Sequence, residues 1–243
     1  MRKLERVIYE LDSIEQTETT SSGMHRIDAR AKLLTLFVYL ICMLSIPTQQ
    51  WSRMVLFLIF PMVVCWQTHF AYGKLFIRSL VIIPFVALVG IFNPWPSFVG
   101  ILIRGVASVQ GVFVLIQTTG FHSLCRGLEG LGVPTLFVTQ LLFVYRYLMV
   151  LLQETLTMQY AREARSFGRK AYTFKQWGTF AGQLLLRTLD RSSRIHQAMM
   201  SRGFDGTFPH PHNSHWSLPD SLYLLMWSAV FLTLRFIPIN FKL

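Results

Sequence analysis

Two short stretches of the sequence place an arginine between small residues and follow it with a phenylalanine. The arginine guanidinium is a permanently charged planar fork that fits a carboxylate or a set of carbonyl oxygens. Small neighbours let another surface approach the backbone, and the phenylalanine adds an apolar anchor. The chemistry that these units predict is therefore docking to a partner, not catalysis. The two units comprise Ala164, Arg165, Ser166 and Phe167 in the first, and Ser201, Arg202, Gly203 and Phe204 in the second.

Each arginine unit falls at the C-terminal end of a predicted amphipathic helix. From Pro134 the sequence runs without another proline or glycine until Gly168, which predicts one long helix, apolar first and charged later. A second helix is predicted from about Phe180 to Arg202, with Gly203 as its C-cap. Residues 168–178 between the two helices are predicted to form a turn and linker. The residues alone leave open a plainer role, in which basic helix ends complement the macrodipole.

The second predicted helix has two distinct faces. Asp190 can pair with Arg187 and Arg194, which leaves Arg191 and Arg202 freer to meet a partner. One face comprises Leu185, Leu189, Ser192, Ile195 and Met199, and the opposite face Arg187, Arg191, Arg194, Ala198 and Arg202.

The composition indicates a membrane protein. Of 243 residues, 52% are hydrophobic and 14% are charged, against roughly 25% charged residues in soluble domains. The formal net charge is +11, and six of the twelve acidic residues lie in the first 28, so the remainder is more strongly basic. In a membrane protein, such charge favours cytoplasmic loops that face anionic lipid or an acidic partner. The apolar content argues against a nucleic-acid binder.

The positive charges predict the topology. Arg26, Arg30 and Lys32 precede the first apolar run, the loop 93–97 is uncharged, and 120–215 holds eleven basic against five acidic residues. The positive-inside rule puts the tail and 120–215 in the cytoplasm. The predicted spans lie in the apolar segments 33–47, 54–67, 75–93, 101–119 and 220–239, with 133–152 as a sixth apolar segment.

Four spans within 33–119 return the chain to the cytoplasm, so a further span at 133–152 would put the basic residues that follow it outside. We therefore assign 133–152 to the cytoplasmic rim, with its apolar half covered by other protein. The alternative that this segment spans the membrane stays open, as does a re-entrant hairpin over 33–67, which leaves the parity of the crossings unchanged. The predicted fold is an all-α membrane protein with about five transmembrane helices and a cytoplasmic coupling domain of long amphipathic helices. Its parts are a cytoplasmic tail 1–32 that carries no secretory signal, transmembrane helices 1–4 within 33–119, a coupling domain 120–215 and a last transmembrane helix 220–239.

Other sites that could do chemistry are weak. The sequence contains no phosphate-binding loop of the form GxxxxGK[ST], and the three cysteines match no zinc or redox spacing. His210, His212 and His215 could hold a divalent metal, but a mobile loop explains them better. A membrane-embedded enzyme, a second class of function, needs a cluster of carboxylates, Cys or His within the spans, and the apolar runs lack carboxylates.

The chain resembles the transmembrane (T) component of energy-coupling factor (ECF) transporters, a kind of ABC importer, and in particular the cobalt/nickel-type subgroup often called CbiQ. The last of the matching stretches is the most specific. They are MHRIDARAKLL at 24–34, LCRGLEGLGVP at 124–134, LFVYRYLMVLLQE at 142–154, AREARSFG at 161–168 and RSSRIHQAMMSRGFDG at 191–206.

The resemblance implies a coupling role in the cell inner (plasma) membrane, with the N-terminus and the coupling domain in the cytoplasm. Family members carry an X-Arg-X motif on each of two coupling helices, and each motif docks in a groove of one ATP-binding subunit. Here the motifs are 164–166 and 201–203, which keep small residues where many members have Gly or Ala. The implied partners are two ATP-binding cassette ATPase subunits, a substrate-binding S component and the lipid bilayer. No cofactor is implied for this chain, because ATP and Mg belong to the ATPases. The implied cargo is cobalt or nickel, and the alternative is a vitamin such as biotin.

Overall fold

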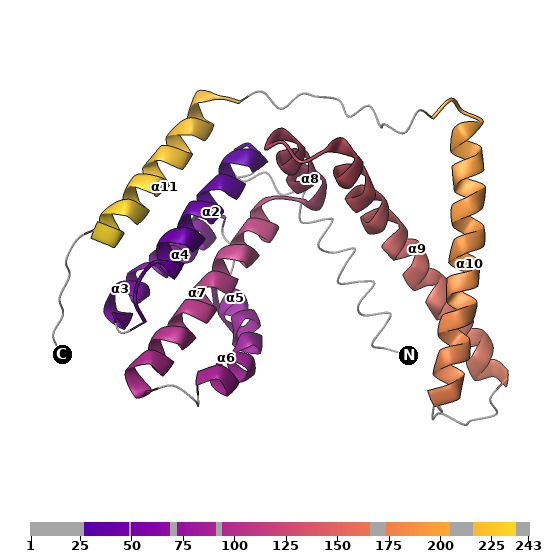
Figure 1. Cartoon of the computed structure of the whole chain (residues 1–243), viewed down its shortest axis with the longest axis horizontal. Helices are drawn as coiled ribbons and strands as arrows, with labels where there is room; N and C mark the ends of the chain where they lie inside the picture. Colours follow the sequence, from indigo (N-terminus) through magenta and orange to yellow (C-terminus); the bar gives the residue numbers. More distant parts are fainter. Residues whose placement is uncertain are drawn as a thin grey trace. The chain divides into compact units, whose positions relative to one another are not determined.

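The computed structural model describes residues 27–48, 50–68, 72–90, 94–165, 174–204 and 216–236. These residues form helices and short connections, with no strand among them (Figure 1). The prediction of an all-α membrane protein is confirmed. The helices are α2 (Ala29–Leu44), α3 (Trp51–Leu56), α4 (Ile59–Gln67), α5 (Tyr72–Ser79), η2 (Leu80–Ile82), α6 (Ile83–Gly90), α7 (Trp95–Thr118), α8 (Phe121–Gly130), α9 (Thr135–Arg165), α10 (Phe174–Met200) and α11 (Leu218–Phe236).

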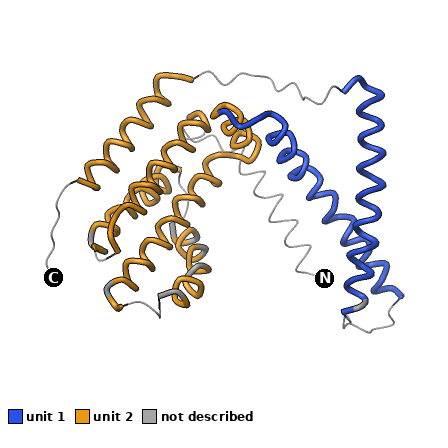
Figure 2. The backbone as a smooth tube through the Cα atoms, in the orientation of Figure 1, with its two compact units in different colours: residues 1–14, 132–211 blue, residues 15–131, 212–243 orange. Residues whose placement is uncertain are grey.

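The chain divides into two compact units (Figure 2). The smaller unit holds α9 and α10, and the larger holds α2 to α8 together with α11. In the larger unit, α2 packs against α7, α8 and α11. Its core is aromatic: the ring of Phe60 lies 5.0 Å from Tyr39, 4.7 Å from Trp227 and 5.2 Å from Phe231, measured between centroids.

A polar cluster around the buried Asp220 joins the start of α2 to the start of α11. The carboxylate of Asp220, 2% exposed, accepts hydrogen bonds from the backbone N–H of Asp28 (2.8 Å) and from the Ser217 hydroxyl (2.6 Å). The Lys32 ammonium, also buried, donates to the Thr118 carbonyl at the end of α7 (2.7 Å). We call these residues the Asp220 anchor. Because a buried polar group is costly unless it is paired, this anchor fixes how the three helix ends meet.

Within the described residues, two helices are long and apolar enough to cross a membrane, namely Ser97–Thr118 within α7 and Thr135–Arg165, which is α9. The predicted apolar segments 54–67 and 75–93 are instead interrupted, the first between α3 and α4 and the second between α5, η2 and α6. Pro61 and Pro84 lie in the first turn of the helix that follows each interruption. Proline is tolerated there because the first N–H groups of a helix have no partner within it.

Gly100 lets α7 pack directly on the backbone of the segment between α2 and α3. A Cβ atom at this position would lie 2.0 Å from the carbonyl oxygen of Thr48. One turn further along α7, the guanidinium of Arg104 donates to the carbonyl of Ile46. The close approach of the two segments therefore depends on the missing side chain.

We expect Gly100→Ala to lower the free energy of unfolding by about 1–3 kcal/mol, because overpacking forces the backbone apart. The thermal unfolding midpoint of the detergent-solubilised chain measures the effect. Gly182→Ala is the matched control, since an added Cβ there meets nothing within 4 Å. Equal midpoints for both variants would contradict the packing described.

Candidate functional site

The two helices that the sequence predicts to carry the arginine units are present as α9 and α10. The first is one uninterrupted helix of 31 residues that begins directly after Pro134, as the sequence predicted. The second begins at Phe174, six residues before the predicted start, so the predicted linker 168–178 is wrong in its last part. Gly178 costs a helix only about 1 kcal/mol, and the rings of Trp177 and Phe180 meet at 6.2 Å across the first turns. Residues 166–173 lie outside the described part of the chain.

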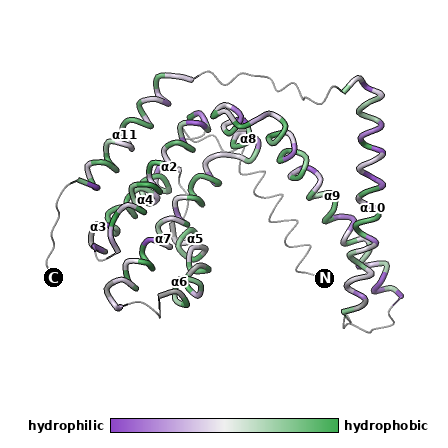
Figure 3. Tube along the Cα trace, in the orientation of Figure 1, coloured by the Kyte–Doolittle hydropathy of each residue, from purple (hydrophilic) through white to green (hydrophobic). Residues whose placement is uncertain are grey.

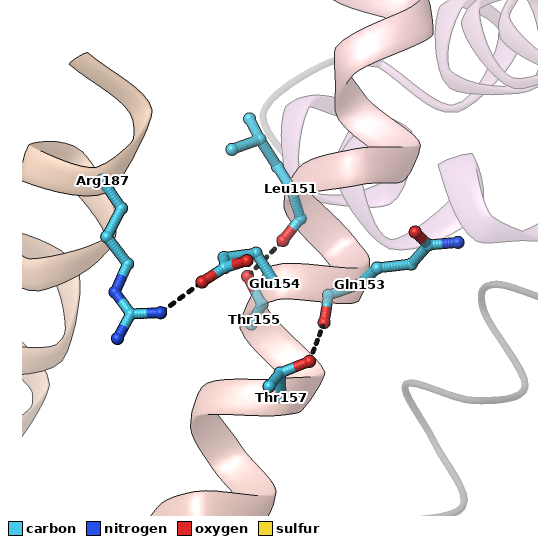
Figure 4. Close-up of polar contacts among 6 residues, drawn as sticks. All are labelled: Leu151, Gln153, Glu154, Thr155, Thr157 and Arg187. Atoms are coloured by element: carbon cyan, nitrogen blue, oxygen red, sulfur yellow. Dashed lines mark hydrogen bonds and ion pairs between the residues drawn. The ribbon is translucent and has the colours of Figure 1, made fainter. Parts of the chain in front are cut away.

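The contacts between α9 and α10 make the pair antiparallel. Near the end of α9, the Arg162 guanidinium donates to the side-chain oxygen of Gln176 at the start of α10 (3.0 Å). Further back along α9, Glu154 forms an ion pair with Arg187 (Figure 4). The sequence suggested that Arg187 pairs with Asp190 in its own helix. Arg187 instead pairs across the two helices with Glu154. The side chains of this ion pair are 58% and 30% exposed, so its stabilisation is small, about 0–1 kcal/mol.

A glycine cap at the end of α10 holds the second arginine unit in place. Gly203 has φ +78°, and its N–H donates to the carbonyl of Met200 (3.0 Å). The N–H of Phe204 donates to the carbonyl of Met199 (3.1 Å). This pattern is a Schellman motif, in which Arg202 is the last residue before the left-handed glycine. Glycine suits the position because other residues are strained at positive φ. The predicted C-cap at Gly203 is confirmed, and Arg202 projects from a fixed turn.

Both arginines are exposed, at opposite ends of the helix pair. Arg165 is the last residue of α9 and Arg202 follows the last turn of α10, and neither has a carboxylate partner among the described residues. Because the helices are antiparallel, the 27 residues of α10 separate the arginines by roughly 40 Å. Ala164, Ser201 and Gly203 are exposed beside them, and Ser166 and Phe167 lie outside the described residues. The two arginine units therefore lie at two separate places on the helix pair, not in one shared pocket.

A groove of about 480 Å³ lies between the N-terminal half of α9 and the C-terminal half of α10. Its walls are mainly apolar, with Arg191 and His196 among the lining residues. The sequence analysis missed this α9–α10 groove because two helices contribute to it, although Phe204 beside the glycine cap was a local sign. The apolar lining residues include Leu136, Phe143, Tyr147, Ile195, Met199 and Phe204.

The first half of α9 also has an apolar outer face. Phe137, Val144 and Leu148, none of which lines the groove, are 61%, 64% and 43% exposed in the described structure. Colouring by hydropathy shows this half of α9 as the more hydrophobic one, whereas α10 is largely hydrophilic (Figure 3). An exposed apolar surface of this kind marks a site of contact with lipid or with another protein.

The sequence comparisons decide the family of the chain. A family model described as "Cobalt transport protein", CbiQ, matches residues 20–216, a stretch that includes both arginine units. The chain belongs to the CbiQ family. The resemblance to the CbiQ family is confirmed.

Curated relatives of this CbiQ-family chain match over shorter stretches. An uncharacterised protein of Methanocaldococcus jannaschii is 30% identical over 123 residues, which are 49% of this chain and 42% of the relative. A protein of Lactiplantibacillus plantarum named nickel permease LarQ is 30% identical over 122 residues, 49% of this chain and 43% of the relative. A protein of Methanocorpusculum labreanum named as a fused cobalt transport protein, CbiMQ, is 27% identical over 138 residues, 56% of this chain and 22% of the relative. The chain thus spans less than half the length of these relatives.

Proposed function

We propose that this CbiQ-family chain is the coupling subunit of an ECF-type ABC importer for cobalt or nickel. It links ATP hydrolysis by two ATPase subunits to movement of a substrate-binding membrane subunit. The observation that carries the proposal is the placement of Arg165 and Arg202, exposed and roughly 40 Å apart on one antiparallel helix pair. Two similar ends at that separation suit two copies of one kind of partner, such as the halves of an ATPase dimer. The names of the relatives, nickel permease and cobalt transport protein, support the choice of cargo.

In this proposal the arginines do no chemistry. Each guanidinium docks in an acidic or carbonyl-lined groove of one ATPase, where it makes charge-assisted hydrogen bonds. ATP binding closes the ATPase dimer and draws the two docked helix ends toward each other. The weak Glu154–Arg187 contact allows α9 and α10 to pivot where they cross. ATP and Mg²⁺ are bound by the ATPases, and this chain needs no cofactor of its own.

We also infer that the substrate-binding subunit covers the apolar outer face of α9. Phe137, Val144 and Leu148 need an apolar cover. The basic charge of 120–215 assigns this helix to the cytoplasmic rim, not to the bilayer centre. Pivoting of α9 then reorients the subunit that rests on it. The complete protein is a multi-pass subunit of the cell membrane, with its N-terminus and coupling domain in the cytoplasm.

The proposal is tested by reconstitution. The chain is co-expressed with the ATPase and substrate-binding subunits of the same source, and uptake of radioactive cobalt or nickel is measured with ATP and with a non-hydrolysable analogue. ATP-dependent uptake that requires this chain is the expected result. Uptake that is equal without the chain would contradict the coupling role.

A cysteine-accessibility scan tests the predicted topology. We expect Asn213→Cys, in the predicted cytoplasmic domain, to react with a membrane-impermeant maleimide only from the cytoplasm, and Pro96→Cys only from outside. The native cysteines Cys42, Cys65 and Cys125 are buried, so their background reaction is low. Reaction of Asn213→Cys only from outside would contradict the predicted cytoplasmic location of 120–215.

A further inference from the structure

We propose that residues 4–14 of this chain dock as a short helix in the α9–α10 groove when no partner subunit occupies it. The segment precedes residue 20, where the match to the CbiQ family begins, so the docking is an addition to the proposed coupling role and does not depend on it. Its apolar residues recur at helical spacing and therefore share one face of a helix. They are Leu4, Val7, Ile8, Leu11 and Ile14.

The groove fits such a helix in size and polarity. An 11-residue helix is about 16 Å long, and the α9 side of the groove runs from Leu136 to Leu151, about 22 Å along the helix axis. Phe143 and Tyr147 on one wall face Ile195 and Met199 on the other. A helix this short is marginal in water on its own, so burial of its apolar face is what stabilises it.

The basic charge of α10 favours this acidic segment over a second copy of the chain as the occupant of the groove. Residues 4–18 carry five acidic side chains and one arginine, whereas α10 through Phe204 carries five basic side chains and one acidic one. Arg191 and His196 lie in the groove lining itself, where they can meet the flanking carboxylates of the segment. The groove of a second chain has the same basic charge and would repel its counterpart.

The segment can reach the groove for any orientation of the two units. Arg30 lies against the end of α8, since a Cβ at Gly130 would sit 1.8 Å from the Arg30 Nε. The chain enters α9 only five residues after Gly130, at Thr135. The twelve residues 15–26 span up to about 40 Å when extended. The tail and the groove are therefore attached close to one point of the larger unit.

Disulfide trapping in the full chain, in lipid nanodiscs without other subunits, tests the docking. Leu11→Cys is combined with Ile195→Cys in the groove and oxidised with copper phenanthroline. We expect an intramolecular disulfide, identified by mass spectrometry. The matched control combines Leu11→Cys with Gln183→Cys, which is exposed on α10 away from the groove lining. Adding Val7→Asp to the groove pair leaves the described helices unaltered, and we expect it to lower the yield about tenfold because it buries an unpaired carboxylate.

Three results would overturn the docking: equal yields for the groove pair and the control pair, no effect of Val7→Asp, or a disulfide that joins two chains. A failure here leaves the ATPase-coupling proposal standing, since the experiment contains no ATPase. Loss of ATP-dependent uptake in the reconstituted importer tests that proposal separately.

Discussion

Arg165→Glu combined with Arg202→Glu abolishes transport and releases both ATPase subunits, if the two exposed helix ends are the docking points. Removal of one partner from a desolvated charge pair costs about 2–5 kcal/mol, so each reversal weakens docking at its end by at least about 30-fold. Glutamate does more harm than alanine, because it adds repulsion from the acidic or carbonyl-lined groove to the lost contact. Uptake, ATPase rate and pull-down of the ATPases are measured side by side.

Single alanine variants at these positions should weaken assembly or uncouple ATP hydrolysis from transport without abolishing either. Arg194→Glu is the matched control, because it reverses an exposed charge on α10 away from the helix end. Arg169→Ala with Lys170→Ala, beyond the described end of α9, should also be tolerated. Normal transport by the double glutamate variant with its ATPases still bound would rule out the docking role.

We expect Asp220→Ala to cause a large loss in the free energy of unfolding of the larger unit. The substitution leaves the N–H of Asp28 and the hydroxyl of Ser217 without their acceptor. It also removes a carboxylate that attracts the buried Lys32 ammonium. A hydrogen bond to a charged group contributes about 1.5–3 kcal/mol, so its loss corresponds to a fall in the thermal unfolding midpoint of about 5–10 °C for a chain of this size. The midpoint in detergent, followed by circular dichroism, is the measurement.

Asp190→Ala is the control for this stability test, since Asp190 is exposed on α10. Its midpoint should stay within about 1 °C of the original chain, as expected for surface substitutions. A midpoint for Asp220→Ala that is just as high would mean that the Asp220 anchor contributes little to holding α2 and α11 together.

Local signals in the sequence predicted the features that depend on neighbouring residues. Pro134 marked the start of α9 and Gly203 the cap of α10, because backbone geometry at proline and glycine is set by the residue itself. Gly178 misled for the same reason: it suggested a linker, but a glycine inside a helix is tolerated where the flanking turns are stable. The interruptions at Pro61 and Pro84 carried the same kind of signal and were missed because the hydropathy of each segment continues across them.

Features that depend on tertiary contacts could not be found in this way. Asp28 and Asp220 are 192 positions apart, and no spacing rule links them. Arg187 has Asp190 three positions away but pairs with Glu154, 33 positions away, because the facing helix brings that carboxylate closer. The groove likewise exists only once α9 and α10 have met. The domain boundaries and the topology stay predictions from charge and hydropathy.

The number of ATPase subunits bound per coupling chain tests the central claim most directly. Native mass spectrometry of the purified complex should find two ATPase subunits on the original chain, one on Arg165→Glu, one on Arg202→Glu and none on the double variant. Equal populations of the one-ATPase complex from both single variants would show that the two helix ends are equivalent docking points. Two ATPase subunits still bound to either single variant, or any bound to the double variant, would contradict the account.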